Sequence, residues 1–210
     1  MNTRRALVAG LGVATLGGLA GRRAMAEPER APHRGTRTAT LPNIPLLTHE
    51  GQTVRFYDDL IRGKVVAINM MYAECEGICP LATSNLVRVQ ALLGPRVGRD
   101  VFLYSLTLQP ELDTPQRLQE YAVMHGVKPG WFFLTGSRAD LERLRYHLGF
   151  FDPNPVVDGD KATHTGMVRI GNDGYDRWTS ASTLALPEQI VATINHVDRS
   201  RGHTGGSSKG

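Results

Sequence analysis

The only two cysteines of the 210-residue chain lie four residues apart, at Cys75 and Cys79. The residues before them, 64–72, form a short apolar stretch rich in valine and isoleucine, which predicts a buried strand. The residues after them, from Pro80 to about Leu93, have apolar side chains at helical spacing, and a helix accepts proline in its first turn. We therefore expect the cysteine pair on a strand-to-helix turn.

Two thiols in such a turn can do two kinds of chemistry. The partial positive charge at a helix N-terminus favours a thiolate, and we expect this effect at Cys79. If the turn is helical, residues four apart face the same way, so the two sulfurs converge. A convergent pair cycles through a disulfide or binds a soft metal ion. A structural disulfide or two buried thiols is the purely structural alternative.

The surrounding pattern predicts the elements that hold the pair. Apolar runs on either side of Glu50-Gly51 indicate an N-terminal β-hairpin. The other predicted strands are 101–108, 131–134, 166–170 and 175–178, and the other predicted helices are 115–125, 138–148 and 187–197. Strands that alternate with helices indicate an α/β domain with a mixed sheet flanked by helices. A cysteine pair after the first core strand makes the expected arrangement thioredoxin-like.

Residues 1–26 have the features of a signal peptide. Arg4-Arg5 precede a mildly apolar stretch, and Ala24-Met25-Ala26 is a small-x-small cleavage site. The paired arginines resemble a twin-arginine signal, which carries folded proteins across the membrane. This segment predicts an exported, periplasmic protein, and a retained signal would make it membrane-associated. A dithiol in an oxidising compartment needs a reductant or a metal to remain useful.

The rest of the chain is predicted to form one domain, 41–198, between a flexible linker, 27–40, and a disordered tail, 199–210. Residues 1–26 hold four of the 24 basic residues and none of the 20 acidic residues. The remaining chain therefore has a formal net charge of zero. This balance gives no support for nucleic-acid binding.

His164 differs from the other six histidines in its position. It stands at the start of a predicted strand, after a loop at 152–160 that is rich in proline, glycine and aspartate. Imidazole is a common metal ligand and proton carrier, so His164 is a candidate functional residue. The ordinary alternative is a strand residue that is hydrogen-bonded to the backbone near the loop.

Three motifs in this order resemble the Sco/SenC/PrrC family. They are Cys75-x-x-x-Cys79-Pro80, then Leu-Gln-Pro-Glu-Leu-Asp-Thr-Pro at 108–115, then His-Thr-Gly-Met-Val at 164–168 with Asn-Asp-Gly at 172–174. The resemblance covers roughly residues 40–198. It implies a thioredoxin-like, peroxiredoxin-like fold and a copper ion, Cu(I) or Cu(II), bound by Cys75, Cys79 and His164.

The resemblance also implies a function. Family members are metallochaperones that help to assemble the binuclear copper site of cytochrome c oxidase. The implied partners are the apo copper-site subunit of that oxidase or another periplasmic copper enzyme, with a thiol reductant or an upstream copper donor. The alternative is a thiol–disulfide oxidoreductase that uses Cys75 and Cys79 to reduce a periplasmic cuproprotein. A peroxiredoxin-type peroxidase is disfavoured, because Ile68 and Tyr72 replace the proline and threonine of its Pro-x-x-x-Thr-x-x-Cys pattern.

Several positions depart from the family pattern. Where family members often have Thr, Pro, Asp and Asp, this chain has Ala73, Glu76, Gln109 and Thr163. Glu74 and Glu76 add negative charge beside the thiols, which is expected to raise the thiol pKa values and to favour a bound cation. Zinc is a weaker candidate than copper, because nothing supplies a fourth ligand or a substrate pocket.

Overall fold

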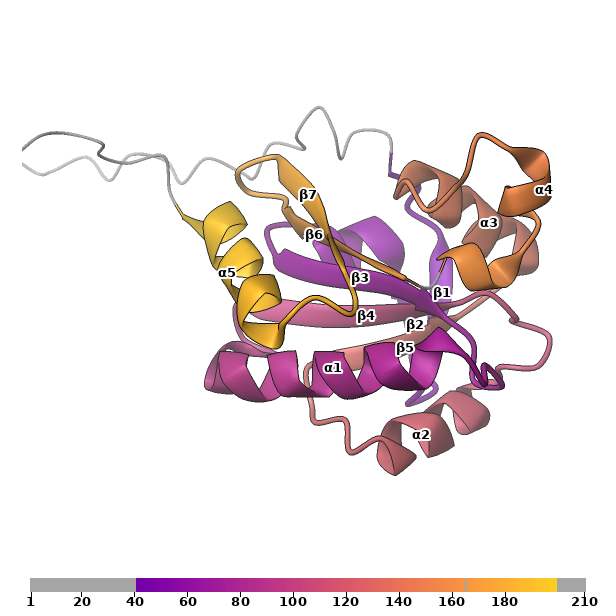
Figure 1. The fold of residues 1–210 in the computed structure, drawn as a ribbon, viewed down its shortest axis with the longest axis horizontal. Helices are drawn as coiled ribbons and strands as arrows, with labels where there is room; N and C mark the ends of the chain where they lie inside the picture. The colour runs from indigo at the N-terminus through magenta and orange to yellow at the C-terminus, as the bar shows by residue number, and fades with distance from the viewer. Residues whose placement is uncertain (1–40, 165, 200–210) are drawn as a thin grey trace, which may run out of the picture. The chain divides into compact units, whose positions relative to one another are not determined.

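A computed structural model of the chain describes residues 41–164 and 166–199. The predicted signal peptide, the predicted linker and the predicted tail beyond residue 199 lie outside this range. The described chain forms one seven-stranded sheet in the order β2-β1-β5-β4-β3-β6-β7, with helices on both of its faces (Figure 1).

The strands are β1 (Pro45–Thr48), β2 (Thr53–Arg55), β3 (Val65–Met71), β4 (Val101–Thr107), β5 (Trp131–Thr135), β6 (Met167–Asn172) and β7 (Arg177–Ser182). The α-helices are α1 (Ile78–Leu93), α2 (Pro115–Met124), α3 (Arg138–His147), α4 (Pro155–Asp158) and α5 (Pro187–Asp198). Three short helical segments of other types are η1 (Phe56–Ile61), η2 (Gly94–Arg96) and η3 (Lys161–His164). None of the helices within this part of the chain has both the length and the apolar character that crossing a membrane requires.

The centre of the sheet is parallel and its flanks are antiparallel. β3, β4 and β5 run parallel, whereas β1 pairs antiparallel with β5 and β6 pairs antiparallel with β3. The register of β3 with β4 ends where Met71 lies opposite Thr107. Because these carboxyl ends lie side by side, the loops that follow β3 and β4 meet. The predicted mixed sheet with an N-terminal hairpin is confirmed.

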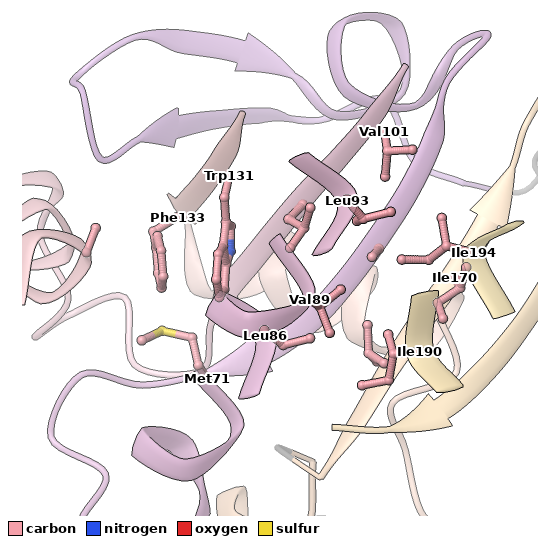
Figure 2. Packing of buried hydrophobic residues seen from close by; sticks show 14 of the residues in the cluster. Met71, Leu86, Val89, Leu93, Val101, Trp131, Phe133, Ile170, Ile190 and Ile194 are labelled. Carbon is pink, nitrogen blue, oxygen red and sulfur yellow. The ribbon is translucent and has the colours of Figure 1, made fainter. Parts of the chain in front are cut away.

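β3 is buried along its whole length and contributes to a hydrophobic core on each face of the sheet. Alternate residues of a strand point to opposite faces, so Val65, Ala67 and Met71 join the core under α1, α2 and α5. Val66, Ile68 and Met70 join the second core, which includes side chains of α3 and η1. Figure 2 shows the first core, with these side chains labelled: Met71, Leu86, Val89, Leu93, Val101, Trp131, Phe133, Ile170, Ile190 and Ile194.

The predicted ends of two helices are confirmed. The Thr114 hydroxyl accepts a hydrogen bond from a backbone N–H in the first turn of α2 at 3.3 Å, and Ser137 does the same for α3 at 3.1 Å. Gly126 and Gly149 follow the two helices with φ of +70° and +81°, a left-handed conformation that glycine adopts without steric cost. Local side-chain chemistry therefore fixes where α2 and α3 begin and end.

The helical turn η1 is not predicted by the sequence pattern. The side-chain oxygen of Asn43 accepts hydrogen bonds from the backbone N–H groups of Tyr57 and Asp58, both at 3.1 Å. This cap comes from a residue 14 and 15 positions away, so no local signal announces it. The second strand of the C-terminal hairpin is also displaced, because β7 spans 177–182 instead of the predicted 175–178.

The expectation that His164 begins a strand is wrong. His164 ends the turn η3, and β6 begins only at Met167. The preceding loop is also partly helical, because Asn154 caps α4 by accepting a hydrogen bond from the Val156 N–H at 3.0 Å. His164 is therefore held by a structured segment that follows α3.

Candidate functional site

The two cysteines lie together at the carboxyl end of β3. Cys75 belongs to the loop between β3 and α1, and Cys79 lies in the first turn of α1. Both are free thiols, with 6% and 1% of their surface exposed. Their side chains form a hydrogen bond with each other. The structure thus brings together the pair that the sequence suggests, at the edge of the first hydrophobic core.

The start of α1 stabilises the thiolate of Cys75. Burial on its own raises the pKa of Cys75, but hydrogen bonds from Cys79, Tyr72 and Gly77 outweigh it and hold that pKa below its ordinary value. The backbone N–H groups of Gly77 and Cys79 are among these donors. The reason is the helix boundary: α1 begins at Ile78, so Cys79 is already inside the first turn. Cys75 therefore receives the unpaired N–H groups of the helix N-terminus.

Tyr72 is a functional candidate that sequence reasoning missed. Its hydroxyl hydrogen-bonds to Cys75, and this contact, burial and the nearby charges raise the pKa of Tyr72 to about 12. A hydroxyl that keeps its proton is a dependable donor to a thiolate. The charge of Asp160 contributes to the same shift, so the segment that carries His164 passes near the thiol loop.

The other side of the thiol loop is bonded to the segment after β4. The buried carboxylate of Asp113 accepts the Ala73 N–H at 3.2 Å, and the Arg117 guanidinium donates to Glu74 at 2.6 Å. Burial raises the pKa of Asp113, although hydrogen bonds to its carboxylate oppose the rise. The ion pair with Arg117 also offsets the charge of Glu74. The expected rise in the pKa of Cys75 from its acidic neighbours is accordingly not observed.

His164 is buried and bonded at one ring nitrogen. Its Nε2 lies 2.9 Å from the carbonyl oxygen of Asp158 and 3.2 Å from Nη1 of Arg145. Nη1 of Arg145 already donates to the carbonyl of Phe150 at 2.9 Å and to the Asp158 carboxylate at 2.7 Å. A carbonyl oxygen can only accept, so Nε2 donates in the contact with Asp158. Nδ1 is then the ring nitrogen that could bind a metal.

A buried ion pair holds this arrangement. The side chains of Arg145 and Asp158 are 6% and 10% exposed and form two hydrogen bonds, at 2.7 and 2.9 Å. The pairing holds the pKa of Asp158 well below its usual range. Asp158 also accepts the Asp152 N–H at 2.8 Å and the Tyr146 hydroxyl at 3.1 Å. Arg145 and Asp158 therefore fix the 150–164 segment against α3, beside a cavity of about 550 Å³ that His164 helps to line.

The three candidate ligands do not form a ready-made metal site. Within residues 41–164 and 166–199, no three His, Cys, Asp or Glu side chains are grouped closely enough to hold an ion. The segments nevertheless lie close together, because a Cβ built on Gly166 would be 3.6 Å from Cδ1 of Ile78, the residue before Cys79. His164 makes the backbone hydrogen bond that the ordinary interpretation expects, with Nδ1 left as the atom that could bind a metal.

Comparisons with known proteins agree with this fold. The chain is 28% identical over 153 residues to a Stutzerimonas stutzeri protein whose name describes copper binding, with 71% of this chain and 73% of the relative covered. Copper-bound ScoI of Bradyrhizobium japonicum superposes with a TM-score of 0.57 at 22% identity, covering 74% of this chain and 99% of that one. Copper-bound yeast Sco1 superposes with a TM-score of 0.59 at 19% identity, covering 77% and 95%. The two structural likenesses establish a shared thioredoxin-like fold.

A family model matches most of the described chain. The model described as SCO1/SenC matches residues 35–197, which include both thiols, Asp113 and His164. The matched range also includes the clamp formed by Arg145 and Asp158. On this match, the chain belongs to the SCO1/SenC family.

Proposed function

We propose that this protein is an exported copper-binding metallochaperone that assembles a copper centre, with the binuclear copper site of cytochrome c oxidase as its first target. The observation that carries the proposal is the convergence of two buried thiols at the start of α1, where hydrogen bonds lower the pKa of Cys75. Thiolates are soft ligands that select Cu(I), and imidazole accepts either copper state. Cys75, Cys79 and His164 are the proposed ligands.

The chemistry of the three groups fits copper as a cargo. Two thiolates and one imidazole leave a copper ion open to attack by a ligand of the acceptor, whereas a closed four-ligand site would retain it. The Nδ1 lone pair of His164 is the donor, because Nε2 is committed to the Asp158 carbonyl. A ligating histidine commonly donates its second N–H to a backbone carbonyl in this way. The proposal requires the 158–166 segment to bring His164 to the thiols when copper binds.

The relatives support the proposal through what they bind. The structures of Bradyrhizobium japonicum ScoI and yeast Sco1 were solved with copper bound. The partners we propose for this chain are the apo copper-site subunit of the oxidase or another periplasmic copper enzyme, and an upstream copper donor or thiol reductant. Export would use the twin-arginine-like segment 1–26, with 41–198 as the copper-binding domain. If the segment is retained, the protein is membrane-associated.

A second candidate function uses the same thiols. The lowered pKa of Cys75 and its contact with Cys79 also suit a thiol–disulfide oxidoreductase that reduces a cuproprotein before loading. One structural relative, BsSco, is described as having a disulfide switch. Cu(II) binding and full Cu(I) binding need His164 and disulfide exchange does not, so that residue discriminates between the two functions.

The test is a competition for Cu(I). The purified protein, reduced under anaerobic conditions, is titrated with Cu(I) in the presence of a strong chelator, alongside Cys75→Ser and Cys79→Ser. We expect one Cu(I) per wild-type chain and loss of tight binding in each variant, because a single thiolate with an imidazole leaves a two-ligand site. Met124→Leu, which removes an exposed thioether, is the control and should bind as wild type does. A cysteine variant that keeps stoichiometric Cu(I) against the chelator would exclude the two-thiolate site.

A further inference from the structure

Asp113 is a buried carboxylate without a cation in contact. It has no exposed surface, and burial raises its pKa. Within the described residues it forms no ion pair, because the nearby Arg117 is hydrogen-bonded to Glu74 at 2.6 Å instead. A buried carboxylate costs free energy unless several donors satisfy its oxygens. The contacts of Asp113 therefore indicate what offsets that cost.

The donors to Asp113 come from the ends of both central strands. The Ala73 N–H, just past β3, donates to the two carboxylate oxygens at 3.2 and 3.3 Å. The Thr107 hydroxyl, at the end of β4, donates to Oδ2. The hydroxyl is the donor because an ionised carboxylate carries no hydrogen, and the same hydroxyl oxygen also accepts the Gln109 N–H at 2.9 Å. The carboxylate thus links the segments after β3 and β4 at the point where the backbone hydrogen bonds between the two strands end.

The position of this link matters for the thiols. The last backbone hydrogen bond between the β3 and β4 segments runs from the Leu108 N–H to the Met71 carbonyl, at 2.8 Å. Beyond this bond, the next N–H of the β3 segment that points towards the β4 segment is that of Ala73, and the Asp113 carboxylate accepts it. The chain then turns, and the Cys75 N–H donates to the Tyr72 carbonyl at 3.2 Å. The carboxylate therefore fixes the peptide from which the turn to Cys75 departs.

We propose that Asp113 is a positioning residue of the thiol site, which sets the place of Cys75 relative to Cys79 through the Ala73 N–H. Asp113 touches neither sulfur in any contact described above, so it acts through the backbone. The copper readout of this proposal rests on the proposed function. A second readout, the stability of the Cys75–Cys79 disulfide, does not.

The chain supplies a matched control in Asp173. That carboxylate is 1% exposed, accepts a backbone N–H from Gly63 at 2.8 Å, and lies 3.3 Å from the hydroxyl of Tyr57. It lies after β6 and contacts the chain just before β3, at the opposite end of that strand from the thiols. Asp173 and Asp113 therefore match in burial and in type of bonding, and differ in their distance along β3 from the cysteines.

The experiment compares Asp113→Ala, Asp113→Asn, Thr107→Val and Asp173→Ala with wild type. Cu(I) affinity is measured by chelator competition, and unfolding by urea. The disulfide is equilibrated with dithiothreitol: the protein disulfide gains two electrons and two protons, and dithiothreitol loses them in forming its own ring disulfide.

We expect Asp113→Ala to lose about 10- to 100-fold in Cu(I) affinity, the usual effect of removing an outer partner of a metal site. Its disulfide should also become several-fold easier to reduce, because the two thiols are held together less well. Asp113→Asn keeps an acceptor for the Ala73 N–H, so its Cu(I) affinity and its disulfide stability should be close to those of wild type. Thr107→Val, in which the new side chain has a similar shape, should lower the Cu(I) affinity and the disulfide stability less than Asp113→Ala does. Asp173→Ala should lower stability to urea and leave both thiol properties near wild type.

Wild-type values for both thiol properties in Asp113→Ala and Thr107→Val would overturn the proposal. So would equal losses in Asp173→Ala, because Asp113 would then act only through general stability. If Asp113→Ala does not fold, Thr107→Val compared with Asp173→Ala decides the outcome by the same criteria. If wild type binds no copper, the proposed function fails, and the disulfide equilibrium alone still supports or refutes the role of Asp113.

Discussion

The Nε2 atom of His164 donates to the carbonyl oxygen of Asp158 at 2.9 Å, while the side chain of the same aspartate pairs with Arg145. The backbone carbonyl of Asp158 thus fixes the ring of His164, and the side chain of Asp158 is fixed by Arg145. The consequence is a hydrogen on Nε2, which makes Nδ1 the ring atom that could bind a metal. The orientation of the proposed third ligand is therefore determined by residues on α3 and α4.

Replacing His164 by alanine should separate copper chemistry from thiol chemistry. Cu(I) is satisfied by two thiolates in near-linear geometry, whereas Cu(II) prefers more ligands with imidazole among them. We expect His164→Ala to lose nearly all Cu(II) binding, to retain part of its Cu(I) binding, and to exchange disulfides at almost the wild-type rate. Titration with Cu(II), followed by thiolate-to-copper charge-transfer absorption, measures the first effect. His147→Ala, an exposed histidine at the end of α3, is the control. An unchanged absorption band in His164→Ala would remove His164 from the site and favour the oxidoreductase.

Two arginines of α3 allow a test of the clamp. Arg145 is buried and paired with Asp158, whereas Arg138 and its partner Glu111 are both about half exposed. Removing one member of a buried pair leaves an uncompensated charge, so Arg145→Met should lower the free energy of unfolding by about 3–5 kcal/mol. Arg138→Met should cost less than about 1 kcal/mol, since solvent screens an exposed pair. Urea unfolding of both variants gives the comparison, and equal losses would show that the Arg145 pair contributes no more than a surface pair.

The same ion pair predicts how stability depends on pH. The pKa of Asp158 is lower in the folded protein than in the unfolded chain, where an aspartate titrates near about 3.9. Its contribution is therefore complete above the unfolded pKa and is lost as the pH falls through the folded pKa. The difference in unfolding free energy between wild type and Asp158→Asn should be constant from pH 7 to about 5 and should shrink below about pH 4. Urea titrations at several pH values measure it, and a difference that grows on acidification would contradict the assignment.

The sequence predicts those parts of the fold that depend on neighbouring residues. The caps at Thr114 and Ser137 and the buried run of β3 are local signals, and the structure agrees with them. The contacts that shape the candidate site are not local. Asp113 reaches Ala73 across 40 positions, and Arg145 meets Asp158 across 13 positions through an intervening turn. No spacing rule links such pairs, because the topology of the sheet and the packing of the loops create them.

A related reason explains why the sequence does not predict the effect of α1 on Cys75. Pro80 marks the first turn of α1 but does not tell on which residue that turn begins. Because α1 begins at Ile78, the backbone N–H groups of Gly77 and Cys79 reach the side chain of Cys75. The type of element is thus readable from the sequence, whereas the chemistry depends on its boundary.

Export can be tested independently of copper. If residues 1–26 act as a twin-arginine signal, replacing Arg4 and Arg5 by lysine should block export, because that pathway requires the arginine pair. N-terminal sequencing of the exported wild-type protein should give a chain that begins at Glu27. Cell fractionation and immunoblotting show where each protein is located, and Arg22→Lys/Arg23→Lys is the charge-matched control. Normal export of the Arg4→Lys/Arg5→Lys variant would exclude the twin-arginine route, and a chain that begins at Met1 in the membrane fraction would indicate an anchor.

Tyr72→Phe should raise the pKa of Cys75, because it removes the hydroxyl that donates to the thiolate and keeps the ring. The measurement is the rate of alkylation by iodoacetamide against pH, made in a Cys79→Ser background so that one thiol reacts. The thiolate is the reacting form, so the loss of Tyr72 should slow alkylation several-fold below the pKa and leave the high-pH plateau unchanged. Tyr121→Phe is the control, since the Tyr121 hydroxyl bonds to Thr83 at 2.9 Å and its ring packs in the same core. Equal profiles for Tyr72→Phe and Tyr121→Phe would mean that the Tyr72 hydroxyl has no part in stabilising the thiolate. A lower plateau would indicate a change in access to the sulfur instead of a change in its ionisation.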